Sequence, residues 1–207
     1  MHSFIDHARR FPGRIAATGE ERERFGRLAQ GQSPEALFIT CSDSRVIPSL
    51  FTGAEPGQLF ELRTAGNAVP DYGAAESASG EAATIEYAVS VLRVPDIVVC
   101  GHSHCGAVRA RVHGDDLAAV PAVAGWLDRQ LPHLPVGEAP ADGVDDAAHV
   151  AASVQSHVKT QLERLRQYPC VSERLAAGEL RLHGWYYAID TGLVMEHDAS
   201  ADAFLPL

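Results

Sequence analysis

The sequence predicts an α/β fold with a mainly parallel central β-sheet flanked by helices, a C-terminal antiparallel edge strand or hairpin, and an N-terminal helical arm. Continuous apolar runs are typical of strands buried on both faces of a parallel sheet, and helical periodicity marks the segments between them. A strand, a helix and a strand in this order favour parallel pairing through crossover connections. We expect one domain over residues 1–207, with a helical arm at 1–30 and an α/β core at 31–207.

The first predicted elements are a helix and two strands. A helix is expected over 18–30, with Thr18 as its N-cap. The apolar run at 35–41 predicts a strand that is buried on both faces. A second strand is expected over 58–63, because the Gly- and Pro-containing residues 53–57 supply a turn before it.

The central segments alternate between helix and strand. Ile85, Val89 and Leu92 recur at the spacing of one helix face, which predicts a helix over 76–92. The run at 96–101 is the clearest buried strand of the chain. The remaining central segments are predicted helices over 105–112, 118–131 and 144–168, and a surface loop over 132–143.

The last segment, residues 180–196, has the alternating pattern of a strand. An Asp-Thr-Gly turn signal at 190–192 interrupts it. The pattern therefore predicts a terminal hairpin or edge strand.

Composition narrows the functional classes. With 17 Lys and Arg against 27 Asp and Glu, the formal net charge is −10, which argues against nucleic acid or an anionic membrane as a partner. No stretch approaches the roughly 20 apolar residues of a membrane span, and residues 1–17 lack the features of a secretory signal. We therefore expect a cytoplasmic protein. Its four cysteines are too few for a disulfide scaffold and are better candidates for metal binding or chemistry.

Ligand-type side chains follow two of the predicted strands. Cys41 ends the first, while His102 and Cys105 follow the strand at 96–101. Because ligands bind outside the carboxyl ends of parallel strands, these three side chains can converge on one point. One imidazole and two thiolates suit zinc, and three protein ligands leave the fourth position open, as in catalytic sites.

Two other interpretations of these residues remain open. Each cysteine could be a small strand hydrophobe, as Cys100 is expected to be. A structural zinc site would instead need a fourth ligand, for which His104, His183 and His197 are the candidates.

Asp43 and Arg45 lie two and four residues after Cys41. In an extended segment, residues 41, 43 and 45 would project to one side, placing a carboxylate next to the open metal position with a guanidinium behind it. Asp43, kept ionised by Arg45, could accept a hydrogen bond from zinc-bound hydroxide and orient it. The alternative is an ordinary Asp–Arg pair that closes the turn after the strand.

With these motifs on view, the sequence resembles the β-class carbonic anhydrases. The resemblance is carried by Cys41-Ser-Asp-Ser-Arg-Val46, by Glu55-Pro-Gly57 with Phe60 and Arg63, by Ile85-Glu-Tyr-Ala-Val89, and by Gly101-His-Ser-x-Cys-Gly106. It implies a zinc enzyme that interconverts carbon dioxide and bicarbonate, with one Zn2+ per chain on Cys41, His102 and Cys105 and with Asp43 and Arg45 as the catalytic dyad. It also implies a homo-oligomer, dimer or tetramer.

The resemblance further implies a substrate pocket formed by Gln32, Phe60, Tyr87 and Gly106, part of which the dimer partner supplies. Phe38 stands where a bicarbonate-switched subgroup has a tryptophan, so the resemblance favours the plant-like, open active-site subgroup. The chain departs from the family pattern at Arg63-Thr-Ala-Gly-Asn67 and at Ala107, which replaces a common glycine.

The expected mechanism is attack of zinc-bound hydroxide on carbon dioxide, with bicarbonate and a proton as products. Two rival functions remain. The same metal core could hydrolyse another small linear molecule, such as carbon disulfide or carbonyl sulfide, or the chain could be a non-enzymatic zinc or thiol module.

Overall fold

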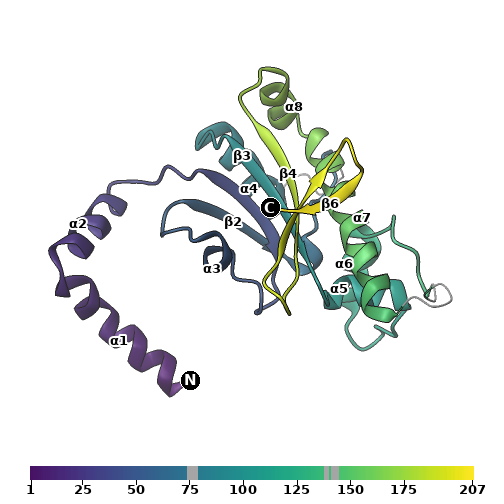
Figure 1. Cartoon of the computed structure of the whole chain (residues 1–207), viewed down its shortest axis with the longest axis horizontal. Coiled ribbons are helices and arrows are strands. Elements are labelled where there is room, and N and C mark those ends of the chain that lie inside the picture. The colour runs from purple at the N-terminus through teal and green to yellow at the C-terminus, as the bar shows by residue number, and fades with distance from the viewer. Residues whose placement is uncertain (74–78, 138–139, 141–144) are drawn as a thin grey trace.

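The computed structural model describes residues 1–73, 79–137, 140 and 145–207. Its centre is a single six-stranded sheet in the order β2-β1-β3-β4-β5-β6 (Figure 1). The strands are β1 Ala36–Cys41, β2 Leu59–Thr64, β3 Asp96–His102, β4 Arg181–Tyr187, β5 Val194–Asp198 and β6 Ala203–Pro206.

The first four strands are parallel and the last two antiparallel, which confirms the predicted α/β class. Strand β1 lies between β2 and β3, and its five residues from Leu37 to Cys41 are buried. In the register, Cys41 lies opposite Thr64 and Thr40 lies opposite Cys100, so the carboxyl ends of β1, β2 and β3 meet at one edge. The predicted convergence of the strand ends depends on this register.

The helices lie where the sequence places them, with two additions. The helices are α1 His2–Ala17, α2 Gly19–Leu28, α3 Pro48–Thr52, α4 Gly80–Glu86, α5 Gly106–His113, α6 Pro121–Gln130, α7 Asp146–Arg166 and α8 Pro169–Ala176, with short helical turns η1 Ala65–Asn67 and η2 Tyr87–Val91. The Thr18 side chain accepts a hydrogen bond from the backbone of Glu21, so the predicted N-cap is confirmed. The helices α3 and α8 and the strand β6 were not predicted; α3 and β6 have only 5 and 4 residues, which is too short for a periodic signal.

The helix predicted over 76–92 is divided in the structure. Helix α4 begins at Gly80, with the Ser79 side chain as its cap, and continues into the wider turn η2; residues 76–78 lie outside the described part of the chain. Arg93, with a φ of 54°, follows the end of this helical segment two residues before Pro95. Buried Arg174 of α8 donates to the carbonyls of Val89, inside this segment, and of Val94, which follows it.

Alternate residues of β1 build two different cores. Leu37 and Ile39 pack in the cluster that includes residues of α7, whereas Phe38 packs with Val98 and Tyr187 on the other side of the sheet. This alternation is the period of two that strand geometry dictates. The longest helix, α7, packs on β3 and β4 and forms the main helical cover of the sheet.

A close approach of α7 to the sheet requires glycine at position 101. A Cβ atom built on Gly101 would lie 2.5 Å from Val154 Cγ1 and 2.8 Å from Val158 Cγ2.

We expect Gly101→Ala to lower the free energy of unfolding by about 1–3 kcal/mol, because overpacking forces α7 away from β3. Denaturant unfolding measures this change. Gly26→Ala is the matched control, since its Cβ would meet nothing within 4 Å; equal stabilities for the two variants would contradict the packing argument.

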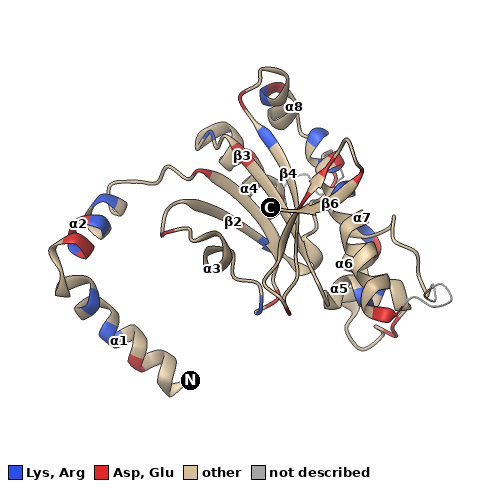
Figure 2. Cartoon of the chain, viewed as in Figure 1, with Lys and Arg blue, Asp and Glu red and all other residues tan. Residues whose placement is uncertain are grey.

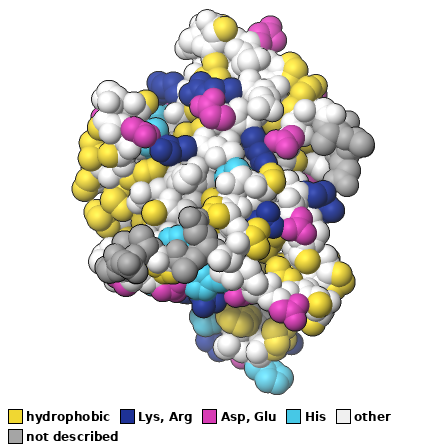
Figure 3. Space-filling view, turned by 90° about the vertical axis from the view of Figure 1, so that its right-hand side faces the viewer, with side chains coloured by type: hydrophobic (Ala, Val, Ile, Leu, Met, Phe, Trp, Pro, Cys, Tyr) yellow, Lys and Arg dark blue, Asp and Glu magenta, His cyan; other side chains and the backbone are white. Residues whose placement is uncertain are grey.

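The N-terminal arm extends away from the sheet, and neither α1 nor α2 buries a residue (Figure 1). Phe4 and Phe11 of α1 are exposed. Both signs of charge are spread along the ribbon, as Figure 2 shows, and basic and acidic side chains are interspersed on the face seen in Figure 3. Within the described residues, no helix has the length and apolar character needed to cross a membrane.

Candidate metal centre

Three side chains meet at the carboxyl edge of the sheet. Cys41 is the last residue of β1, His102 is the last residue of β3, and Cys105 caps the N-terminus of α5. Their possible ligand atoms all lie within 4.8 Å of one another, and all three residues are buried. Adjacent strands bring the first two together, and a tight turn with His104 at a φ of 57° returns the chain to add the third.

The donor set fits a metal ion. The Nδ1–H of His102 donates to the Ser103 carbonyl at 2.9 Å, because a carbonyl can only accept, and this leaves the Nε2 lone pair free. His102 Nε2 is buried and has no hydrogen-bond partner in the described structure. A buried imidazole nitrogen of this kind is costly unless something binds it. One imidazole and two sulfurs within reach of one point are ligands that zinc prefers.

The two thiols differ in how easily they lose their protons. Hydrogen bonds donated by the Cys105 thiol and by the Gly66 backbone lower the pKa of Cys41 well below its usual value. Its own hydrogen bond to Cys41, and its burial, raise the pKa of Cys105. One thiolate therefore forms readily and the second requires the positive charge of a metal.

No fourth ligand joins this group among the described residues. His183 bonds Asp96 and Glu196, and His197 bonds Asp202. His104 contributes its backbone carbonyl to Arg45. The group has the three protein ligands expected of an open, catalytic type of site.

Asp43 and Arg45 form a bidentate ion pair beside the metal ligands. Arg45 Nε and Nη2 donate to the two carboxylate oxygens at 2.9 and 2.7 Å, and the Arg45 backbone N–H adds a third bond at 2.9 Å. The Arg45 guanidinium holds the pKa of the Asp43 carboxyl well below its usual range. The premise of an extended segment was wrong: the chain turns at Ser44 and Arg45, since the carboxylate bonds the backbone two residues on.

A second arginine, Arg63, organises this turn; it was named above only as part of a motif. The Arg63 guanidinium on β2 donates to the carbonyls of Cys41, Asp43 and Val46 at 2.7 to 3.0 Å. The Asp43 carbonyl also accepts from the Val46 backbone N–H at 3.1 Å, so the guanidinium ties the end of β1 to the turn that follows it. The signal in the sequence was Arg63 itself, at the end of a strand next to the Cys41 strand.

The predicted pocket residues are divided between the two ends of the sheet. Gly106 begins α5 and adjoins Cys105, so it lies at the metal ligands. Phe60 and Tyr87 lie together, with ring centroids 6.0 Å apart. Phe60 precedes by four residues the Thr64 that pairs with Cys41, a distance of about 13 Å along the strand.

Gln32 is exposed in the loop before β1, at the end of the strand opposite to Cys41. The structure of one chain therefore does not bring Gln32 and Phe60 to the metal ligands. Tyr87 is 45% exposed, which leaves it available to another molecule.

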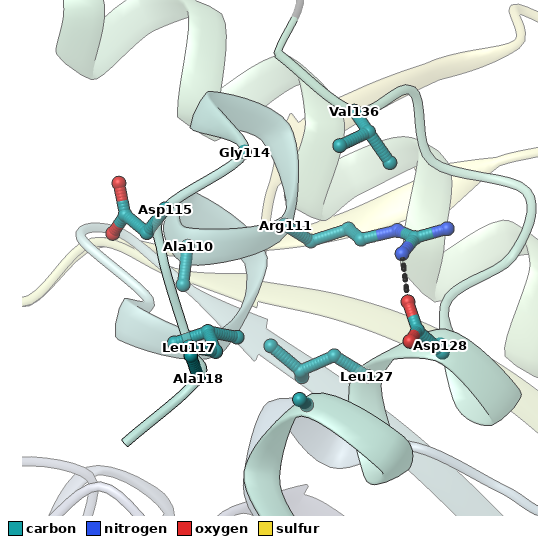
Figure 4. A pocket seen from close by; sticks show the side chains of 10 residues that line it. Ala110, Arg111, Gly114, Asp115, Leu117, Ala118, Leu127, Asp128 and Val136 are labelled. Carbon is teal, nitrogen blue, oxygen red and sulfur yellow. Dashed lines mark hydrogen bonds and ion pairs between the residues drawn. The ribbon is translucent and has the colours of Figure 1, made fainter. Parts of the chain in front are cut away.

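The cavity shown in Figure 4 is separate from the three ligands. It lies between α5 and α6, has a volume of about 240 Å³, and contains the ion pair of Arg111 with Asp128 at 2.5 Å. A larger cavity of about 570 Å³ lies on the sheet and is lined by residues that include Phe38, Val98 and Trp185. Neither cavity includes a residue of the metal centre.

The protein is a mainly parallel α/β fold with an imidazole and two thiols converging at the carboxyl edge of its sheet, a group of side chains able to hold a metal ion. A profile of the carbonic anhydrase family matches residues 36–194. The chain belongs to the carbonic anhydrase family, and its relatives of known structure place it in the β class.

Relatives match over nearly the whole chain. A carbonic anhydrase of Pseudomonas aeruginosa is 44% identical over 207 residues, which are 100% of this chain and 92% of the relative. Carbonic anhydrase 1 of Escherichia coli O157:H7 is 44% identical over 183 residues, 88% of this chain and 82% of the relative.

Solved structures agree. The β-carbonic anhydrase CcaA superposes with a TM-score of 0.86 at 36% identity and covers 100% of this chain and 99% of its own. A tetrameric β-carbonic anhydrase of Sordaria macrospora superposes with a TM-score of 0.75 at 27% identity. The match covers 94% of this chain and 95% of the Sordaria chain.

Proposed function

We propose that this chain catalyses the reversible hydration of carbon dioxide to bicarbonate and a proton, with one Zn2+ held by Cys41, His102 and Cys105. The observation that carries the proposal is the buried three-ligand group with the Asp43–Arg45 pair beside it. Family membership and relatives named carbonic anhydrase support the reaction.

The residues of the site have complementary roles in the proposed mechanism. Zinc, when bound, supplies the Lewis acidity that lets water act as a nucleophile near neutral pH. Asp43 accepts a hydrogen bond from the attacking water and so directs its lone pair toward carbon dioxide. Arg45 keeps that carboxylate ionised and fixed, and the backbone N–H of Gly106 is the donor for a substrate oxygen.

The intact Asp43–Arg45 pair also bears on the proposed subgroup. With both carboxylate oxygens bound to Arg45, Asp43 is held as an acceptor and not as a metal ligand. This arrangement, together with Phe38, supports the plant-like, open active-site subgroup.

We further propose a homo-oligomer, dimer or tetramer, in which another copy completes the pocket with Gln32, Phe60 and Tyr87. The position of Gln32 and Phe60 at the far end of their own sheet supports this arrangement. An arm that buries none of its residues and a 570 Å³ cavity on the sheet also support it, because monomers rarely leave such surfaces uncovered. The structural relative from Sordaria macrospora is tetrameric.

The cytoplasm is the proposed location. The proposed substrate is a small molecule, and neither nucleic acid nor a membrane is a proposed partner. All four cysteines are free thiols, which supports a reducing compartment.

Stopped-flow hydration of carbon dioxide, before and after zinc removal, tests the proposed activity. We expect the catalysed rate to fall to the uncatalysed background when a chelator removes the metal, and to return when one equivalent of zinc is added. Carbon disulfide and carbonyl sulfide serve as competing substrates in parallel assays. Faster turnover of either one than of carbon dioxide would favour the alternative hydrolase, and zinc bound without any turnover would favour a non-enzymatic module.

A further inference from the structure

The turn Ala65–Gly66–Asn67 brings a backbone donor to one of the metal ligands. Gly66 N–H donates to Cys41 Sγ at 3.4 Å. A hydrogen bond to a thiolate draws negative charge away from the sulfur and fixes the orientation of the side chain. The Gly66 contact therefore tunes the ligand without touching the metal. What holds the turn in place is therefore relevant to the metal centre.

The turn does not hold itself. Gly66 has φ 75° and ψ 24°, and Asn67 has φ 47°, so two successive residues are left-handed. The Asn67 side chain is buried, and neither its Nδ2 nor its Oδ1 atom has a partner in the described structure. Two left-handed residues persist only where the surroundings require them.

Trp126 of α6 supplies the first external contact. Its indole Nε1–H donates to the Ala65 carbonyl at 2.9 Å. That carbonyl and the Gly66 N–H belong to the same peptide group. A bond accepted by the carbonyl polarises the amide, so the indole strengthens the donation to Cys41 as well as positioning it.

His157 of α7 supplies the second contact. It is fully buried, and its Nε2–H donates to the Gly66 carbonyl at 2.7 Å. Its Nδ1 must then accept, and it lies 3.0 Å from His133 Nε2 and 3.3 Å from Gln161 Nε2. Burial lowers the pKa of His157 to about 3, so the ring is a neutral imidazole with a fixed tautomer.

We propose that Trp126 and His157 are positioning residues of the metal centre, which hold the two peptide groups of Gly66 so that its N–H donates to the Cys41 thiolate. The inference deepens the proposed function and rests on it. The role differs from general core packing, because each side chain acts through one directional N–H aimed at one carbonyl.

Trp126→Phe removes the indole N–H and keeps most of the ring. We expect it to weaken zinc binding about 10-fold, the lower end of the effect of outer contacts on metal sites. Trp185→Phe is the matched control, because Trp185 Nε1 has no partner in the described structure, and it should leave the zinc affinity unchanged. Competition with a chromophoric chelator measures both affinities in the full-length protein.

His157→Leu removes the second donor and should also weaken zinc binding about 10-fold or more. His157→Gln places an amide N–H close to the position of Nε2 and should recover most of the affinity. Rescue by glutamine separates the hydrogen bond from the volume of the side chain. If His157→Leu fails to fold, Trp126→Phe and His157→Gln still decide the matter.

Cobalt substitution gives a readout that a purely structural role would not move. Loss of an N–H donor raises the energy of the sulfur lone pair, so the sulfur-to-cobalt charge-transfer band of Trp126→Phe should shift to lower energy. Zinc affinity and band position equal to those of wild type would overturn the inference while leaving the proposed hydration activity intact. A wild-type chain that binds no zinc would overturn both.

Discussion

Asp43→Ala is expected to lower kcat for carbon dioxide hydration by about 100-fold or more while leaving one zinc per chain. A positioned acid or base group contributes roughly 100- to 10,000-fold in rate, and alanine removes the acceptor that directs the attacking water. Stopped-flow hydration, with zinc measured on the same sample, checks both parts of the expectation.

Asp128→Ala is the matched control for this variant. Asp128 also pairs with an arginine, Arg111, but that pair lines the cavity between α5 and α6 and touches no metal ligand. The control should retain wild-type turnover. A zinc-replete Asp43→Ala variant that hydrates carbon dioxide at the wild-type rate would falsify the role of Asp43.

The lowered pKa of Asp43 in the wild-type protein predicts how the rates of wild type and Asp43→Ala depend on pH. Because Arg45 lowers the pKa of Asp43, the carboxylate is ionised at and above the usual Asp value of about 4, and its contribution is lost only as the pH falls through the lowered value. Titration of Asp43 therefore cannot produce a change in rate near neutrality. We expect the plots of kcat against pH for wild type and for Asp43→Ala to have the same midpoint near neutrality, where zinc-bound water is expected to ionise. The two plots should differ only in the maximal kcat that they reach at high pH.

Cys105→Ala is expected to abolish stoichiometric zinc binding and to reduce hydration to the uncatalysed background. The variant leaves one imidazole and one thiolate, in a fully buried position where water cannot easily replace the missing ligand. Elemental analysis after dialysis against a weak chelator gives the zinc content.

Cys100→Ala provides the comparison for Cys105→Ala. Cys100 is as deeply buried, on strand β3, but its thiol donates to the Gly101 carbonyl and burial raises its pKa to about 12. This variant should keep its zinc. One tightly bound zinc per chain in Cys105→Ala would mean that Cys105 is not a ligand.

Most of the sheet was predictable because its signals are local. The apolar runs at 35–41 and 96–101 each match a strand to within one residue at either end, and the turn at 190–192 lies between β4 and β5 as expected. Burial on both faces leaves a continuous apolar signature that needs no knowledge of the partner strand. Short elements such as α3 and β6 have too few residues to leave one.

The candidate pocket was less predictable than the metal ligands. Cys41 and His102 end neighbouring strands, so strand prediction alone brought them together. Gln32 and Phe60 came from the resemblance, and the single chain keeps them at the opposite end of the sheet. Local pattern carries no information about which molecule supplies a side chain.

By itself, the sequence determined the fold class, the three ligand types and their convergence, because hydrophobic period and strand-end position are properties of short segments. Only the tertiary structure decided how those ligands are supported. Arg63 reaches the Cys41 turn from β2. Trp126 reaches the Ala65 carbonyl and His157 reaches the Gly66 carbonyl, from helices 61 and 91 residues away in sequence. Such bonds depend on the direction of single N–H groups between distant elements, which side-chain periodicity does not encode.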